Sequence, residues 1–426
     1  MKAEAHPVPE TEAQKGPGMR EFIAMMAALM ASNALAIDAM LPALPAIGGD
    51  LGIDEENRRQ LVITFYLLGF GGAQLFWGPL ADRFGRKRLM SGALVLYGAF
   101  ALVAGLASSF PMLLGARVLQ GISAAASRVL VVAVVRDRYH GPAMARVMSL
   151  VMIVFMIVPV LAPSFGQGVL SIGRWRHIFI GLAVYGVGLA LWTGLRLPET
   201  LPKEKRRPLS LGHIGEAAAT TIRNRQSIGN SLVQTLTMGA LFGFINSIQQ
   251  IVFDVFERPE LMAVAFALIA GPMAISSYAN SKLVMRLGSR RILLLALTAF
   301  TSMAGIHLLV AATLGETIWS FVLLQAGTMT FFGLIGANAG ALAMEPLGHI
   351  AGTASSLQGV FTTVGGALIG FAIGQQFDGT TLPFLAGFTI SGGLGLAAAW
   401  WANRPPSKDC RDEGTVDAEE IASRPA

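Results

Sequence analysis

The sequence predicts an all-α polytopic membrane protein, in which twelve transmembrane helices form two six-helix bundles. Of its 426 residues, 53% are hydrophobic and 14% are charged, whereas soluble domains carry about 25% charged residues. Long stretches, such as residues 61–77 and 89–114, contain no charged residue, and about 20 apolar residues suffice for a helix to cross a bilayer. A basic turn that recurs at the same place in each half of the chain completes the prediction.

Twelve apolar segments follow one another along the chain. In the first half, predicted as an N-terminal bundle over residues 21–196, the spans cover residues 21–46, 59–80, 88–108, 111–135, 146–170 and 175–196. In the second half, predicted as a C-terminal bundle over residues 229–403, they cover residues 229–253, 261–285, 291–313, 317–344, 352–376 and 381–402.

Three polar segments flank and separate the bundles. Residues 1–20 are polar and contain prolines, a composition typical of disorder, and the apolar stretch that follows is too long for a secretory signal. Residues 197–228 are rich in proline, lysine and arginine and are predicted to be a cytoplasmic linker. An amphipathic piece around residues 211–222 is expected to lie on the membrane surface. Residues 404–426 form a polar tail, predicted to be cytoplasmic.

The distribution of basic residues predicts the orientation. The turn between the second and third spans carries Arg83, Arg86, Lys87 and Arg88, and short basic loops stay on the cytoplasmic side. With both termini inside, cytoplasmic segments hold twenty-five of the 32 lysines and arginines, and external loops hold five. The net charge of +6 therefore reports orientation in a bacterial inner membrane rather than a patch for anionic partners, and nucleic acid is not an expected partner.

Other function classes need residues that this sequence lacks. A single cysteine, Cys410, allows no disulfide, and the six histidines lack the spacing of metal ligands, so neither a metal nor a cofactor is expected. No phosphate-binding lysine motif is present, which argues against an ATP-driven pump. An intramembrane hydrolase would need paired aspartates, a serine–histidine pair or an HExxH motif in the spans. None occurs, so we do not expect an enzyme.

The basic turn after the second span has a degenerate copy after the eighth. Residues 286–291, RLGSRR, echo residues 83–88, RFGRKR, and each copy lies between the second and third spans of its half. Two six-span halves related in this way are typical of transporters that bind substrate between the halves, near the bilayer midplane.

At this turn the sequence resembles a known family. The loop signature of the major facilitator superfamily is complete, with Gly78, Leu80, Ala81, Asp82, Arg83, Gly85, Arg86 and Lys87 in the required positions. Four further stretches resemble its bicyclomycin/chloramphenicol-resistance (Bcr/CflA) branch of drug:proton antiporters: residues 37–45, 117–121 with Arg136 and Asp137, 159–166, and 351–359. The resemblance implies the major facilitator fold and export of small amphipathic compounds in exchange for protons, without a cofactor. We expect a monomer whose partners are its substrate, protons and the lipid bilayer.

Asp38 is the only acidic residue well inside a span of the first half. A carboxylate there costs about 2.5–3.5 kcal/mol on insertion scales, so it usually faces a cavity or a partner. At 1.5 Å per residue, Asp38 lies about 12 Å and Arg117 about 9 Å from the external ends of their spans, which allows the two to pair. Such a pair either couples protons to transport or only holds two helices together; the resemblance favours coupling.

Arg128 follows Arg117 by eleven residues, about three helical turns, and so lies on the same face of the fourth span. It either extends a polar track along the cavity or snorkels toward the cytoplasm.

Gly78, Asp82, Arg83, Gly85 and Arg86 form a predicted conformational latch. The glycines permit close helix approach and a tight turn. The resemblance implies that the residues matching Gly78, Asp82 and Arg83 hold the eleventh span in the outward-facing state. The alternative is that the basic turn only anchors the topology.

Pro159, Pro163 and Gly166 form a predicted hinge in the external half of the fifth span. Interior prolines free backbone carbonyls and kink a helix. The stretch resembles the antiporter signature of that span, although a kink that does not set the direction of transport would need the same residues.

The second half offers a lining for the substrate cavity that is polar but has few charges. Asn246, Gln249 and Gln358 are its candidate hydrogen-bonding residues, and Phe331 is a candidate stacking residue. Aromatic side chains and methionines suit bulky, weakly specified ligands.

Together these residues predict a proton-coupled exporter that works by alternating access. The alternatives are a proton-coupled symporter or an exporter of one specific metabolite, which Asp38 and Arg117 would serve equally well. A receptor or scaffold that transports nothing is a third class, for which neutralising Asp38 changes no activity.

Overall fold

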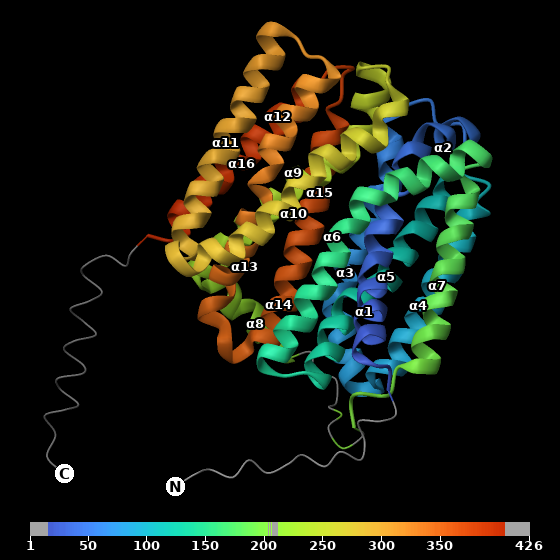
Figure 1. Cartoon of the computed structure of the whole chain (residues 1–426), viewed down its shortest axis with the longest axis vertical. Coiled ribbons are helices and arrows are strands. Elements are labelled where there is room, and N and C mark those ends of the chain that lie inside the picture. The colour runs from blue at the N-terminus through green and yellow to red at the C-terminus, as the bar shows by residue number, and fades with distance from the viewer. Residues whose placement is uncertain (1–15, 203, 205, 207–211, 405–426) are drawn as a thin grey trace, which may run out of the picture.

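The computed structural model of the protein describes residues 16–404 except 203, 205 and 207–211. The predictions for residues 1–15, for the tail after Arg404 and for part of the linker fall outside the described residues. The described chain is helical, without a strand, and twelve of its helical segments are long and apolar enough to cross a membrane (Figure 1). The predicted fold class and the number of spans are therefore confirmed.

The first half contains the spans α1 to α7 and three short segments between α1 and α3. The spans are α1 (Met19–Asp38), α3 (Leu61–Phe84), α4 (Arg86–Gly105), α5 (Phe110–Arg138), α6 (Gly141–Ile172) and α7 (Arg176–Arg196). The short segments are η2 (Leu41–Ala43), α2 (Leu44–Asp50) and η3 (Glu56–Gln60). The first predicted span is thus broken after Asp38, because Pro42 and Pro45 have no N–H to continue the helical ladder.

The second half is more interrupted. Its continuous spans are α10 (Met262–Leu287), α11 (Ser289–Leu314) and α16 (Leu382–Ala402), with η6 (Pro259–Leu261) before the first of them. The other three are composite: α9 (Arg225–Gln250) with the π-helix η5 (Ile251–Val255); α12 (Ile318–Thr330) with α13 (Phe332–Met344) and η7 (Glu345–Ile350); and α14 (Ala351–Val360), the π-helix η8 (Phe361–Gly365) and α15 (Gly366–Gln375). The linker contains α8 (Gly212–Arg223), close to the predicted amphipathic piece.

The repeated basic sequences form the same kind of turn in both halves. α3 ends before Gly85 with φ +95°, and α10 ends before Gly288 with φ +75°. Backbone of this kind favours glycine, because any side chain would be strained there. The sequence repeat is thus matched by a repeated turn geometry.

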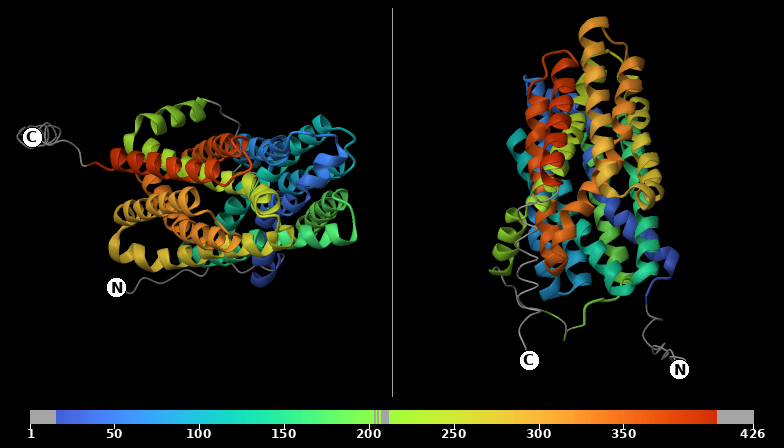
Figure 2. Two further views of the ribbon diagram at one scale, coloured as in Figure 1. Left: turned by 90° about the horizontal axis from the view of Figure 1, so that it is seen from above. Right: turned by 90° about the vertical axis from the view of Figure 1, so that its left-hand side faces the viewer.

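The two halves stand side by side, the first at the right of Figure 1 in blue to green and the second at the left in yellow to red; Figure 2 gives two more views. They meet where α3 packs against α14, η8 and α15, and where α6 packs against α10. We call the end with the α3–α4 turn and α8 the linker end, and the end with α2 and η3 the far end.

Candidate functional site

Asp38 is the last residue of α1, at the point where the first span changes direction. Its side chain is 3% exposed, and its Oδ1 has no hydrogen-bond partner among the described residues. The next segments, η2 and α2, restart the helix after the prolines. Interrupted helices at membrane depth are typical of ion and substrate sites in transporters.

Arg117 of α5 is fully buried and contacts the same part of α1. Its Nη2 donates to the carbonyl oxygen of Ala36 at 3.1 Å, and its Nε donates to that of Val62 at 3.1 Å. Its Nη1 donates to Gln120 Oε1 at 2.7 Å, and the guanidinium lies 4.2 Å from the centroid of the Tyr66 ring. These donors are committed to α1, α3 and α5. The direct ion pair with Asp38 that matching depths allowed is therefore not formed in this structure.

The predicted hinge residue Gly166 lies against the residue that follows Asp38. A Cβ at Gly166 would collide with the carbonyl oxygen of Ala39, and it would lie 3.0 Å from Pro42 Cγ. Pro159 and Pro163 lie earlier in α6, which runs unbroken through both. The structure therefore places the hinge region beside the buried acid. The sequence had assigned them to different spans and predicted no contact between them.

The candidate amides of the second half lie in two places. Asn246 and Gln249 of α9 are each 1% exposed; both amide atoms of Asn246, and Nε2 of Gln249, have no partner in the part of the chain that the structure describes. The η2 segment after Asp38 contacts α9. Gln358 of α14 instead donates to Gln234 Oε1 at 2.8 Å, and Phe331 lies at the break between α12 and α13. Gln234 was not among the predicted site residues.

Arg128 differs from Arg117, although both belong to α5. Its side chain is exposed, and it makes no hydrogen bond or ion pair with any described residue. Whether it extends a polar track or snorkels stays a prediction.

Arg86 is the centre of the predicted latch and is 4% exposed. Its Nη2 lies 3.0 Å from Asp82 Oδ1, and its Nε lies 2.5 Å from Asp137 Oδ2. The linker joins this cluster, because Glu199 accepts a hydrogen bond from the Arg86 N–H at 2.8 Å and Thr200 donates to Asp137 at 3.0 Å.

The remaining latch residues make fewer contacts. A Cβ at Gly78 would have only Val129 nearby, at 3.9 Å, and one at Gly85 would collide with the carboxylate of Glu199. Arg83 is exposed beside the ring of Phe84. In this structure Asp82 pairs with Arg86, and its contact with the eleventh span in another conformation stays a prediction.

A set of amides closes the far end between the halves. Gln60 Nε2 donates to Gln250 Oε1 and to the carbonyl oxygen of Gly374, the latter at 3.1 Å. Asn57 Nδ2 donates to the carbonyl oxygens of Gln375 and Phe377 at 3.2 and 3.0 Å, and Gln250 Nε2 donates to Asn57 Oδ1 at 2.8 Å. We call these side chains the far-end lock: Asn57, Gln60, Gln250 and Gln375.

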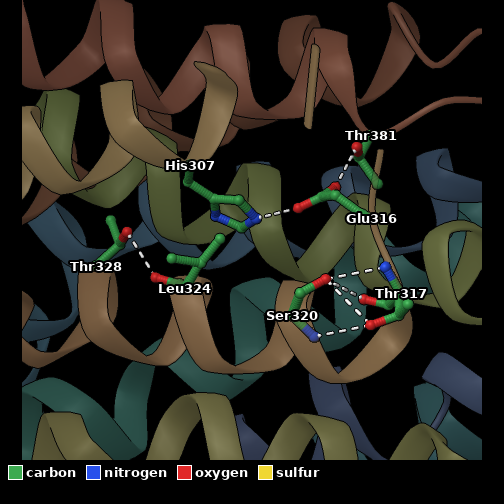
Figure 3. A network of polar contacts seen from close by, with 7 residues as sticks. All are labelled: His307, Glu316, Thr317, Ser320, Leu324, Thr328 and Thr381. Atoms are coloured by element: carbon green, nitrogen blue, oxygen red, sulfur yellow. Dashed lines mark hydrogen bonds and ion pairs between the residues drawn. The ribbon is translucent and has the colours of Figure 1, made fainter. Parts of the chain in front are cut away.

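A buried polar group in the second half was also missed from the sequence. His307 Nε2 of α11 lies 2.6 Å from Glu316 Oε1, and Thr381 donates to Glu316 Oε2 at 2.7 Å (Figure 3). The His307 side chain is 0% and that of Glu316 4% exposed. A histidine inside a span, nine residues before a glutamate, was the signal that was available. Among the described residues no group of three or more histidines, cysteines or acids could hold a metal.

Comparisons with known proteins agree with this architecture. The family model "Major Facilitator Superfamily" matches residues 26–370. A bicyclomycin resistance protein homolog of Haemophilus influenzae is 29% identical over 85% of this chain and 91% of the relative. The multidrug resistance protein MdtL of Salmonella heidelberg is 32% identical over 82% of this chain and 87% of its own. The crystal structure of the human organic anion transporter MFSD10 (TETRAN) superimposes with a TM-score of 0.64 at 19% identity, covering 91% of this chain and all of that one.

Proposed function

This chain belongs to the major facilitator superfamily, and we propose that it is a proton-coupled antiporter that exports small amphipathic compounds across the bacterial inner membrane. That it is a membrane transporter rather than an enzyme follows from the family and from relatives named for bicyclomycin and multidrug resistance. The proton step, the direction and the cytoplasmic placement of the linker end are the parts that we propose.

One observation carries the proton step. Asp38 is a buried carboxylic acid whose Oδ1 accepts no hydrogen bond within the described residues. An ionised carboxylate at membrane depth without a donor is costly. A change in its surroundings that brings a donor, water or a cationic cargo would therefore change how readily Asp38 holds a proton.

The proposed cycle uses this exchange. Cargo enters from the linker end while Asp38 is ionised, and the two halves then rock about the contacts of α3 and α6. At the far end Asp38 takes up a proton and the cargo leaves. The halves rock back, and the proton dissociates from Asp38 to the cytoplasm. Since Gly166 packs directly behind Ala39, movement of α6 would reach the Asp38 region without an intermediate residue.

The substrate site is proposed between the halves, near Asn246 and Gln249. Their amide groups without partners among the described residues could bind a polar group of the cargo. Bicyclomycin is a suitable first probe, because a relative is named for resistance to it. Tetraphenylphosphonium, an amphipathic cation without hydrogen-bonding groups, is a suitable second one.

The test uses everted membrane vesicles that contain a pH-sensitive dye and carry an imposed acid-inside gradient. Adding bicyclomycin or tetraphenylphosphonium should dissipate the gradient in vesicles with the wild-type protein, whereas vesicles with Asp38→Asn should hold it. A symporter would not dissipate the gradient under these conditions. Equal dissipation by wild type and Asp38→Asn would disprove the role of Asp38.

A further inference from the structure

Two adjoining hollows lie at the linker end of the second half. The larger is a cleft of about 1320 Å³ between the start of α9, the α10–α11 turn, and the ends of α13 and α16. The smaller is a groove of about 490 Å³ between α11 and α16. Leu294 of α11 lines both, so that the cleft continues into the groove.

The cleft is strongly basic. Arg225, Arg290, Arg291 and Arg404 line it, against a single acid, Glu345. Arg290 and Arg291 are exposed, and neither makes a hydrogen bond or ion pair with another described residue. The acid is already engaged, since Gln226 Nε2 donates to Glu345 Oε2 at 2.7 Å. Two guanidinium groups are thus available for an anion.

The other two arginines are held in place by the protein. Arg225 Nη2 donates to the carbonyl oxygen of Arg404 at 2.6 Å, and the Arg404 guanidinium lies 3.4 Å from the centroid of the Trp400 ring. Trp400 also lines the groove. It therefore connects the basic cleft with the apolar hollow beside it, at the level where tryptophans mark the membrane surface.

The groove has the character of a site for an alkyl chain. Its lining consists of Leu294, Thr298, Gly393, Leu396, Ala397 and Trp400. From Trp400 to Gly393 it follows seven residues of α16, about 10 Å toward the bilayer centre at 1.5 Å per residue. A Cβ at Gly393 would have no atom within 4 Å, which shows that the groove is open at its deep end.

We propose that these hollows bind an anionic phospholipid of the cytoplasmic leaflet, with its phosphate beside Arg290 and Arg291 and one acyl chain in the α11–α16 groove. Basic pockets between transmembrane helices on the cytoplasmic side are suited to such headgroups. Free phosphate would use the cleft and leave the groove empty. The tail after Arg404 contains six acidic residues and is the rival occupant of the cleft within the chain. Only the placement in the cytoplasmic leaflet rests on the orientation in the proposed function.

The test is native mass spectrometry of the full chain in detergent, titrated with dioleoyl phosphatidylglycerol or dioleoyl phosphatidylcholine. The wild type should bind phosphatidylglycerol at least about tenfold more tightly, and Arg290→Gln/Arg291→Gln should weaken that binding about 25-fold, about fivefold per arginine. The control Lys87→Gln/Arg88→Gln removes the same charge from the matching turn of the first half and should bind as the wild type does.

A second variant tests the groove without changing charge. Gly393→Leu places a side chain in the open end of the groove and should weaken binding of the dioleoyl lipid about tenfold, with less effect on a lipid of the same headgroup and short chains. Retained binding in both variants would overturn the proposal, as would equal affinity of the wild type for the two headgroups. Displacement by 10 mM inorganic phosphate would assign the cleft to free phosphate. A tenfold gain in lipid affinity on truncation after Arg404 would show that the tail occupies the cleft in the full chain. Either result would overturn the lipid as the occupant of the cleft in the intact protein.

Discussion

The two halves treat buried polar groups in different ways. In the first half the buried arginines have partners, since Arg117 donates three hydrogen bonds and Arg86 lies between two carboxylates. Asp38 is the exception there, because its Oδ1 has no partner among the described residues. In the second half, Asn246 and Gln325 are buried amides whose side-chain atoms have no partner among the described residues. A satisfied charge holds one arrangement, whereas an unsatisfied amide can still bind something.

Helix continuity differs in the same sense. Apart from α1, the spans of the first half are unbroken, but three spans of the second half are composite, two of them through π-helices. π-helical turns inside α-helices occur frequently at functional sites. Under the proposed mechanism, the first half would hold the geometry of the proton step and the second half would adapt to cargo. The triad of His307, Glu316 and Thr381 is a partial exception in the second half, because both oxygens of Glu316 have partners, whereas His307 Nδ1 has none among the described residues.

Of the variants considered, Arg117→Met should have the largest effect on stability and transport. It removes the donor of three hydrogen bonds, to the carbonyl oxygens of Ala36 and Val62 and to Gln120 Oε1. Hydrogen bonds from a charged group contribute about 1.5–3 kcal/mol each to the free energy of unfolding. We expect the melting temperature of the detergent-purified protein to fall by roughly 10 °C, and bicyclomycin-driven proton release to be lost.

The matched control is Arg128→Met, on the same helix. Because Arg128 is exposed and makes no hydrogen bond or ion pair with a described residue, its loss should leave the melting temperature within about 2 °C of the wild type. A fall as large as that of Arg117→Met would show that burial and hydrogen bonding do not distinguish the two arginines.

Gly166→Leu should have the next largest effect, because a side chain there forces α6 away from the α1–η2 junction beside Asp38. Overpacking of this kind costs about 1–3 kcal/mol, occasionally more. We expect transport to be lost while part of the protein still folds, as measured by fluorescence-detected gel filtration. Gly168→Leu, two residues on, has open space around its Cβ and should behave as the wild type. Equal transport by the two variants would contradict the contact.

The sequence predicted the spans well because hydropathy depends on composition alone. The fourth span, predicted over residues 111–135, is α5 over Phe110–Arg138. Breaks inside apolar runs were missed, since the π-helices η5 and η8 change the hydrogen-bond register without changing composition. The break after Asp38 was an exception that Pro42 and Pro45 could have revealed.

The candidate site was predictable by residue type but not by partner. Asp38 and Arg117 stand out as charges within spans, yet two of the three hydrogen bonds of Arg117 go to backbone carbonyls, which have no signature in a sequence. The far-end lock could not be predicted from the sequence, because Gln60 and Gln375 are ordinary polar residues that lie 315 positions apart in the chain. Neither the close approach of Gly166 to the carbonyl oxygen of Ala39 nor the contact of Glu199 with Arg86 could be derived without coordinates.

Gln60→Ala should have a smaller effect, at the seam where the halves meet. It removes the hydrogen bonds to Gln250 and Gly374, and such bonds in membrane proteins contribute about 0.6 kcal/mol each on average. We expect the far end to open about five- to tenfold more often. Spin labels at Asp54 and Asp378, in a protein with Cys410→Ser, would report this as a longer inter-label distance.

Gln376→Ala is the control, because the Gln376 side chain is exposed and has no hydrogen-bond partner in the described chain. Identical distances in both variants would show that the lock does not hold the halves.

Asn246→Ala should have the smallest effect on stability and a selective effect on cargo. No hydrogen bond with a described residue is lost, so the melting temperature should change by less than about 2 °C. If the amide binds cargo, the apparent affinity for bicyclomycin, which carries hydroxyl and amide groups, should fall about tenfold, the equivalent of about one hydrogen bond left unmade. The affinity for tetraphenylphosphonium should stay unchanged.

Gln234→Ala is the contrasting variant, because it breaks existing hydrogen bonds to Gly336 and Gln358 and should therefore lower the melting temperature. An equal loss of affinity for both cargoes would mean that Asn246 shapes the site without binding a polar group. The second half would then adapt to cargo by packing alone.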